Sequence, residues 1–361
     1  MSQTVSSPAP GTRLAKRHAP IINRTIAIDG LTIVADILHQ AAQRLEQIGD
    51  DGLGNGRPFD LDTLWQLLQR GRTYATPSSW AELYQLLNEQ IQEQITFVER
   101  RRRGDYTTDP YGFDEDILAR VRPLMRFMYR FWWRIDAFGL ENVPATGRAL
   151  LVANHSGVLP WDGAMIATAI YDTHPARRLV RNLYLHWFNT LPMVAPLFAS
   201  LGQVAGRPEN AVRLLEEDEI VCTFPEGARG VGKRFQQRYQ LMRFGRGGFA
   251  RVALQTGTPM IPVAVVGAEE AYPMIGNAES LARLLGLPFF PITPFFPWLG
   301  PVGTIPLPTH WTITFGEPIS TVEYGPDAAH DPLIVSKLSQ QVRNIIQETI
   351  NTQLAVRTSI F

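Results

Sequence analysis

The sequence predicts an α/β fold in which helices flank a central mixed sheet, with a further helical region before it. Its 361 residues are enough for a large buried core, and the hydrophobic fraction of 45% is that of a globular protein. From about residue 115 onwards, strand-like apolar runs alternate with stretches of helical periodicity. We therefore expect a disordered tail and helical region over residues 1–110, and the α/β domain over residues 111–361.

The N-terminal part begins with a segment, Met1–Pro20, that is rich in Ser, Pro and Arg and lacks the apolar core of a signal peptide. Apolar residues at helical spacing predict one helix over residues 34–48. Ser79 and Glu82 match a capping box, which predicts a second helix that runs to about residue 98. These helices indicate no function beyond packing or dimerisation.

The next expected helix, Glu115–Phe138, has an unusual distribution of side chains. Aromatic residues occupy much of its surface, and arginines recur at every fourth position, which places them in one stripe: Arg122, Arg126, Arg130 and Arg134. This pattern is typical of a helix that lies in an anionic membrane interface. The alternative is a core helix with one solvated basic face.

Four apolar runs downstream predict the strands of the sheet: Ala149–Ala153, Glu219–Phe224, Met260–Val266 and Trp311–Phe315. Stretches between them predict helices, including Gly163–Tyr171, Asn210–Glu217 and Gly247–Thr256. The glycine-rich stretch Gly245–Gly248 is interpreted as a turn that opens the last of these helices, because it lacks the other features of a phosphate-binding loop. In α/β sheets of this kind, functional residues gather where the strands end.

The longest uncharged run covers residues 284–308, which is nominally enough to cross a bilayer. It contains seven prolines, which exclude a regular helix, so no transmembrane helix is expected. Its five aromatic rings suit an acyl-chain wall or a loop that dips into a membrane; the alternative is packing on the core of the domain. We expect a peripheral protein on the cytoplasmic side of a membrane.

The composition excludes several other functions. Basic and acidic residues balance at 34 each, so a broad nucleic-acid-binding surface is not expected. The single cysteine, Cys222, excludes a disulfide framework and favours a reducing compartment. The seven histidines and this cysteine show no metal-ligand spacing, so no metal site is expected.

The strongest indication of function is a histidine at the end of the first apolar run. Asn154 and His155 follow this run directly, and Asp162 comes after a short loop that contains Gly and Pro. A carboxylate that holds one imidazole nitrogen leaves the other free to act as a general base. Since six residues separate His155 from Asp162, the loop must fold back to bring the side chains within ~2.6–3.2 Å. Asp162 also suits the N-cap of the following helix, and both roles are compatible.

The sequence contains no Gly-x-Ser-x-Gly elbow and no other signature of a nucleophilic Ser or Cys beside this pair. The histidine is therefore expected to take its proton from a bound substrate rather than from a hydroxyl of the enzyme.

At these residues the sequence resembles the glycerolipid acyltransferase superfamily. Its motif residues are most similar to those of the monoacylglycerol- and diacylglycerol-acyltransferase-like branch. Four blocks occur in the order of the family between about residues 120 and 320. They are Asn154–Gly163, then Gly202 with Arg207, then Phe224–Gly227 with Arg229, and then Ile261–Val263.

The resemblance implies transfer of a fatty acyl group from acyl-CoA or acyl-carrier protein to a glycerolipid hydroxyl, without a cofactor, a metal or an acyl-enzyme. The acceptor stays open among lysophosphatidate, other lysophospholipids and mono- or diacylglycerol. His155 and Asp162 would be catalytic, and the substrate-binding residues would be Asn154, Arg207, Glu226, Gly227 and Arg229. For the two arginines the expected ligand is a phosphate, which matches the guanidinium fork, and the alternative is a surface salt bridge.

Two other functions remain open at this point. A lipid ester hydrolase would use the same histidine and aspartate to activate water, and a non-catalytic homologue would only bind lipid.

Overall fold

The computed structural model describes residues 88, 92–190 and 193–361 of the chain. Residues 92–103 are helical, and most of the second predicted N-terminal helix lies outside the described residues, as does the whole of the first. The chain divides into two units, Met1–Glu99 and Arg100–Phe361. The α/β fold lies in the second unit.

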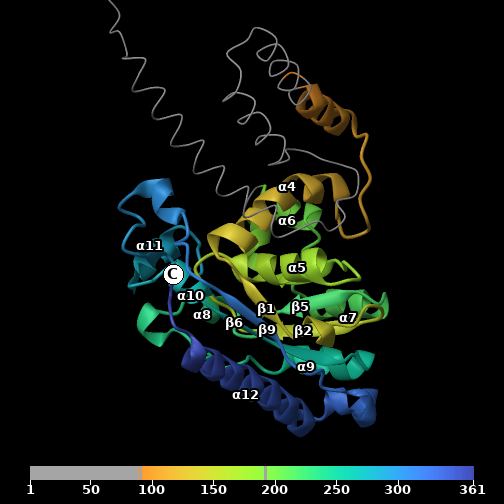
Figure 1. The fold of residues 1–361 in the computed structure, drawn as a ribbon. Coiled ribbons are helices and arrows are strands. Elements are labelled where there is room, and N and C mark those ends of the chain that lie inside the picture. The colour runs from red at the N-terminus through yellow and green to blue at the C-terminus, as the bar shows by residue number, and fades with distance from the viewer. Residues whose placement is uncertain (1–87, 89–91, 191–192) are drawn as a thin grey trace, which may run out of the picture. The chain divides into compact units, whose positions relative to one another are not determined.

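Seven strands of this unit form one mixed sheet in the order β1-β9-β6-β2-β5-β3-β4 (Figure 1). Neighbouring strands are parallel, except that β6 and β9 are antiparallel. The four predicted runs are confirmed as β2, β5, β6 and β9. The strands of this sheet are β1 Asp136–Phe138, β2 Ala149–Ala153, β3 Val180–Tyr184, β4 Val204–Ala205, β5 Ile220–Thr223, β6 Met260–Val266 and β9 Thr312–Phe315.

Helices cover both faces of the sheet. In Figure 1, α4, α5 and α6 lie on one side of the strands, and α9 and α12 lie on the other. The three predicted helices between the strands correspond to α5, α7 and α9. The bounds are α4 Glu115–Phe127, α5 Trp161–Thr173, α6 Val194–Ser200, α7 Pro208–Glu216, α8 Ala228–Val231, α9 Gly248–Thr256, α10 Ala268–Ala271, α11 Glu279–Leu284 and α12 Pro332–Val356.

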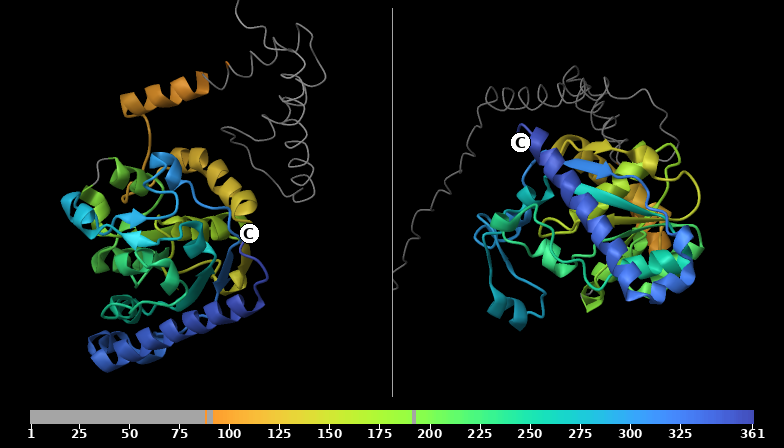
Figure 2. Two further views of the ribbon diagram at one scale, coloured as in Figure 1. Left: turned by 90° about the vertical axis from the view of Figure 1, so that its left-hand side faces the viewer. Right: turned by 90° about the horizontal axis from the view of Figure 1, so that it is seen from below.

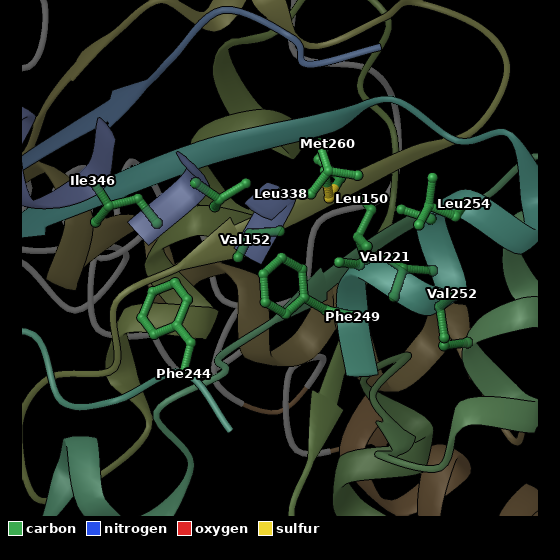
Figure 3. Packing of buried hydrophobic residues seen from close by; sticks show 14 of the residues in the cluster. Leu150, Val152, Val221, Phe244, Phe249, Val252, Leu254, Met260, Leu338 and Ile346 are labelled. Atoms are coloured by element: carbon green, nitrogen blue, oxygen red, sulfur yellow. The ribbon is translucent and has the colours of Figure 1, made fainter. Parts of the chain in front are cut away.

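The core consists of two clusters, one on each face of the sheet. Ala149, Leu151 and Ala153 of β2 point to the cluster that contains α5, while Leu150 and Val152 point to the cluster that contains α9 and α12. Figure 3 shows this second cluster from close by. Because both faces are covered, the central strands read as continuous apolar runs, and polar residues can be accommodated only beyond their ends.

The long helix α12 is not among the predicted elements, although its sequence carries clear signals. Asp331 accepts a hydrogen bond from the Leu333 N–H (2.8 Å) and Pro332 occupies the first turn, which is a favourable start for a helix. Buried apolar residues recur at every third or fourth position: Val335, Leu338, Val342, Ile346 and Ile350. Seen from below, α12 crosses the face of the strands (Figure 2, right).

The prediction of one helix over Glu115–Phe138 is wrong in its second half. The α-helix ends at Phe127, a π-helical turn follows over Met128–Trp132, and the last three residues form β1. The wider turn brings the indole of Trp133 into the core, where it is fully buried and stacks on Trp311 with ring centroids 4.3 Å apart.

The proline-rich run 284–308 forms an irregular excursion that begins at the last residue of α11. It contains the short strand β8 Pro291–Ile292, which pairs with β7 Gly276–Asn277 from before α11, and a 3-10 turn, Gly300–Thr304. Figure 2 (right) shows it standing out from the sheet. No helix among the described residues is long and apolar enough to cross a membrane.

Candidate active site

His155 lies just beyond the end of β2, and its ring is held by Asp162. The Nδ1 atom and the Asp162 Oδ2 atom are 2.7 Å apart, which is the hydrogen-bonding distance expected from the sequence. The same carboxylate oxygen accepts a hydrogen bond from the Ser156 N–H (2.8 Å). Asp162 is fully buried in the first turn of α5, so it is directed to this loop rather than to solvent. The ring of His155 stacks on Phe224, with centroids 4.4 Å apart.

These contacts define which nitrogen of His155 is free. An ionised carboxylate only accepts hydrogen bonds, so Asp162 favours the tautomer that carries its proton on Nδ1. The other nitrogen, Nε2, has no hydrogen-bond partner in the described part of the chain, and the side chain keeps 10% of its surface exposed. The geometry therefore leaves Nε2 as the ring nitrogen that is open to a further contact.

The six-residue loop folds back at Gly157. This glycine has a φ of +79°, a left-handed conformation that side chains disfavour, and a Cβ atom there would lie 3.2 Å from the Ala268 carbonyl oxygen. The loop then returns to α5, and the extra length leaves His155 and Asp162 in contact.

Glu226 holds the main chain of this loop. Its Oε1 atom accepts a hydrogen bond from the His155 N–H (2.9 Å), and its Oε2 atom accepts one from the Met242 N–H (2.7 Å). The side chain of Glu226 is fully buried. Both oxygens of this carboxylate therefore accept hydrogen bonds from the protein itself. They join the main chain of His155 to that of Met242.

The charge of Glu226 is balanced by a buried lysine. Lys233 Nζ lies 3.4 Å from Glu226 Oε2 and 2.7 Å from Glu269 Oε1, and its side chain is 2% exposed. The other oxygen of Glu269 accepts a hydrogen bond from the Tyr239 N–H (2.8 Å). Burial raises the pKa of Glu269, and the adjacent Lys233 opposes this rise. One buried cation is thus shared by two buried carboxylates, one of which holds the main chain of His155.

Replacing Lys233 by Met is expected to lower the free energy of unfolding by ~3–5 kcal/mol, because two carboxylates would stay buried without their cation. Chemical denaturation followed by circular dichroism measures this change. Lys337→Met is the matched control, since Lys337 is exposed on α12 and should tolerate the substitution. A loss below about 1 kcal/mol in Lys233→Met would show that the buried carboxylates do not depend on the lysine.

The side chain of Asn154 binds the main chain of the neighbouring strand, β6. Its Nδ2 donates to the Val265 carbonyl (3.0 Å) and its Oδ1 accepts from the Val265 N–H (2.7 Å), so the amide extends the pairing of β2 with β6. The residue is fully buried. Both polar atoms are thus used to fix the end of the strand from which His155 projects.

Two glycines of the motif after β5 fit its tight turn. Gly227 has φ +57° and ψ −147°, a combination that residues with a side chain rarely adopt. Gly230, one turn of α8 later, packs on the histidine: a Cβ atom there would lie 2.8 Å from the His155 Cβ. Any side chain at residue 230 would therefore displace His155.

The predicted substrate-binding arginines occupy different places. Arg229 lines an open pocket of about 460 Å³ next to Glu226, together with two arginines from the chain before α9, Arg243 and Arg246. Arg207 follows β4, three strand positions from β2, which corresponds to about 14 Å across the sheet. It lies at the same edge of the sheet but does not line this pocket.

The sequence predicts no role for Gly230, Lys233 or Arg243, and it indicates only a turn for the glycine-rich stretch that contains Arg246. The sequence offers one indication for Lys233, because lysine is rare in this chain. It has only three lysines, Lys16, Lys233 and Lys337, against many arginines. The two arginines carry none, since only the fold brings their segment beside the motif after β5. Among the described residues, no group of His, Cys, Asp and Glu is arranged to hold a metal ion.

Comparisons with known proteins identify the family of this chain. Residues 134–266, which include His155, Asp162 and Glu226, match the Acyltransferase family model. An uncharacterized protein of Mycobacterium tuberculosis is 46% identical over 80% of this chain and 79% of its own length. The human DGAT1/2-independent enzyme synthesizing storage lipids is 23% identical over 61% of this chain and 62% of its own length.

Among solved structures, the 1-acyl-sn-glycerophosphate acyltransferase of Thermotoga maritima is similar with a TM-score of 0.43 and 15% identity, over 73% of this chain and 90% of its own. The family match and the relatives confirm the resemblance found in the sequence. The chain belongs to the glycerolipid acyltransferase superfamily and is an acyltransferase.

Proposed function

We propose that this enzyme moves a fatty acyl group from acyl-CoA or acyl-carrier protein to a hydroxyl of a glycerol-based lipid, with His155 as the general base. The observation that carries the proposal is the contact of Asp162 with His155 Nδ1, which leaves Nε2 without a partner in the described part of the chain. No metal or other cofactor is required in this scheme, because a thioester is already activated toward attack by a hydroxyl.

In the proposed reaction, His155 Nε2 removes the proton of the acceptor hydroxyl as its oxygen attacks the thioester carbonyl. The C–O bond forms, and main-chain N–H groups near the glycine-rich loops stabilise the tetrahedral oxyanion. The intermediate then expels the thiolate as the C–S bond breaks, and the imidazolium returns its proton to the sulfur. Asp162 stabilises the imidazolium throughout, and Glu226, Asn154 and Gly227 are proposed to position the histidine loop rather than to contact the acyl chain.

A product assay tests this proposal. Purified protein is incubated with labelled acyl-CoA or acyl-carrier protein and a panel of lysophospholipids, mono- and diacylglycerols, and the lipids are separated. We expect the label in an ester of one acceptor class. Label that appears only as free fatty acid would identify a thioester hydrolase, release of unlabelled fatty acid from the lipids would identify a lipid ester hydrolase, and the absence of any product from folded protein would favour a binding homologue.

The acceptor has to reach His155 from a lipid phase, and we propose that the excursion over residues 284–308 contacts the membrane surface. Its exposed apolar side chains include Leu284 (80%) and Trp298 (70%). The excursion lies beside the site, since Phe289 packs near Gly232, two residues after the glycine that contacts His155. The Tyr272 hydroxyl also donates to the Thr304 carbonyl (2.9 Å), and it accepts from the indole of Trp161, adjacent to Asp162 (3.1 Å).

The arginine stripe does not form the free basic face that the sequence suggests. Arg122 and Arg126 both pair with the buried Asp172, at 2.7 and 3.3 Å. Arg134 lies beyond the helix and donates to the carbonyl oxygens of Trp132 (3.0 Å) and Pro308 (2.9 Å). These arginines hold α4 and the segment after it on the domain, so we assign the membrane contact to the apolar excursion instead.

Leu284→Ser and Trp298→Ser together are expected to weaken sedimentation with liposomes by about tenfold or more, because each removes apolar surface that would leave water at the membrane. Leu333→Ser is the matched control: this leucine is also 80% exposed, but lies at the start of α12. Equal sedimentation of the double variant and the control would contradict a membrane role for the excursion.

A further inference from the structure

The pocket beside Glu226 carries more positive charge than the protein itself balances. Its lining includes Arg229 from α8 and Arg243 and Arg246 from the chain before α9. All three are exposed, and none makes a hydrogen bond or an ion pair with another residue in the described ranges. Three cations around one concave surface repel one another and attract an anion.

The one acidic residue that lines the pocket does not neutralise these arginines. Both carboxylate oxygens of Glu226 accept main-chain hydrogen bonds, from His155 and Met242, and Lys233 lies 3.4 Å from one of them. Many other arginines of the domain do have acidic partners, for example Arg148 with Asp218. The positive charge of the pocket is therefore available to a ligand.

The main chain that carries the two arginines before α9 is anchored to the core. Phe244, which lies between them in the chain, is buried among the side chains of α9 and α12 (Figure 3). Arg343 of α12 donates to the Leu241 carbonyl (2.8 Å), and Gln347 of α12 accepts from the Leu241 N–H (2.9 Å). The segment that carries Arg243 and Arg246 is therefore ordered before any ligand binds, which reduces the entropic cost of binding.

We propose that Arg243 and Arg246, together with Arg229, form a binding site for a phosphate group of a substrate. A guanidinium fork matches the oxygens of a phosphate, and three such groups suit a phosphate monoester or a diphosphate better than a single carboxylate. A volume of about 460 Å³ accommodates the phosphate and part of the molecule that carries it.

The inference rests on the proposed function, in which phosphate enters from two sources. Coenzyme A carries a diphosphate and a phosphate monoester, and a phosphorylated lysolipid carries a phosphate on its headgroup, whereas mono- and diacylglycerol carry none. The sequence predicted that Arg229 and Arg207 bind a phosphate, but Arg207 does not line this pocket. The fold instead places Arg229 with Arg243 and with Arg246, which lies in the glycine-rich stretch that the sequence indicated only as a turn.

The test uses the full chain with Arg243→Gln/Arg246→Gln and with all three arginines replaced by Gln. Lys337→Gln is the control, because it removes an exposed charge outside the pocket. Isothermal titration calorimetry first measures binding of inorganic pyrophosphate and of coenzyme A, independently of turnover. We expect both sets of pocket replacements to weaken binding of at least pyrophosphate by about tenfold or more, with a smaller dependence of binding on salt concentration.

Steady-state kinetics then identifies the source of the phosphate. A KM that rises about tenfold for acyl-CoA alone assigns the site to the donor, and the same rise for lysophosphatidate but not for monoacylglycerol assigns it to the acceptor. The proposal is overturned if the folded triple variant binds pyrophosphate and coenzyme A as the wild type does and keeps both KM values within about twofold. Arginine-dependent binding of pyrophosphate in a protein without acyl transfer would retain the phosphate site and contradict only the proposed function.

Discussion

His155→Ala is expected to lower turnover by ~10²-fold or more while the protein stays folded, because the reaction would lose its general base. The histidine side chain is stacked on Phe224 and bonded to Asp162, but its main-chain contact to Glu226 does not depend on the side chain. Initial rates of acyl transfer, measured with donor and acceptor both saturating, report the loss directly.

The control for this variant is His174→Ala. His174 is also buried, at the opposite end of α5, and its Nδ1 accepts a hydrogen bond from the Ala176 N–H (3.2 Å). Its removal costs comparable packing but no chemistry, so turnover should stay within about twofold of the wild type. Near-normal turnover in folded His155→Ala protein would exclude the histidine as the base.

Asp162→Asn is the second substitution with a large expected effect. In the wild type, three N–H groups donate to the carboxylate: His155 Nδ1, Ser156 N and Gly163 N. An amide has only one acceptor oxygen, so in either orientation its NH₂ group faces one or more of these donors. The negative charge that would stabilise the imidazolium is also lost. We expect turnover to fall by ~10²-fold or more, with little change in KM.

Asp331→Asn provides the comparison for this change. Asp331 also lies at the start of a helix, where it accepts a hydrogen bond from Leu333, but no histidine depends on it. Asparagine caps a helix nearly as well as aspartate, so this variant should keep its activity. If Asp162→Asn were as active as Asp331→Asn, the reaction would not depend on the carboxylate beside His155.

The parts of the fold that could be predicted are those with a local pattern. The strands β2 and β6 are covered on both faces, so their residues are uniformly apolar and their limits agree with the predicted runs. The strand β3 was not predicted, because Arg181 and Asn182 interrupt its apolar pattern. Arg181 is buried in β3, where it forms ion pairs with Asp109 and Glu219 that no local pattern reveals.

The same distinction applies to the site. His155 and Asp162 are close in sequence and follow a strand, so their contact could be anticipated from the chain. The ion pairs of Lys233 with Glu226 and Glu269 could not, because Glu226 and Lys233 follow β5 whereas Glu269 lies in α10 after β6, and only the fold brings them together. The role expected for Glu226 from the family motif, contact with the substrate, is likewise replaced in our account by a hydrogen bond to the main chain of His155.

We infer that the acyl group passes directly from the thioester to a lipid hydroxyl, with His155 as the base and without an acyl-enzyme. The most direct test mixes the enzyme with acyl-CoA in a rapid-quench instrument, with and without the acceptor lipid, and follows thiol release and the intact mass of the protein. We expect that thiol release requires the acceptor and that the mass of the protein stays unchanged at every time point. A burst of thiol that matches the enzyme concentration without acceptor, with an acyl group on the protein, would contradict it.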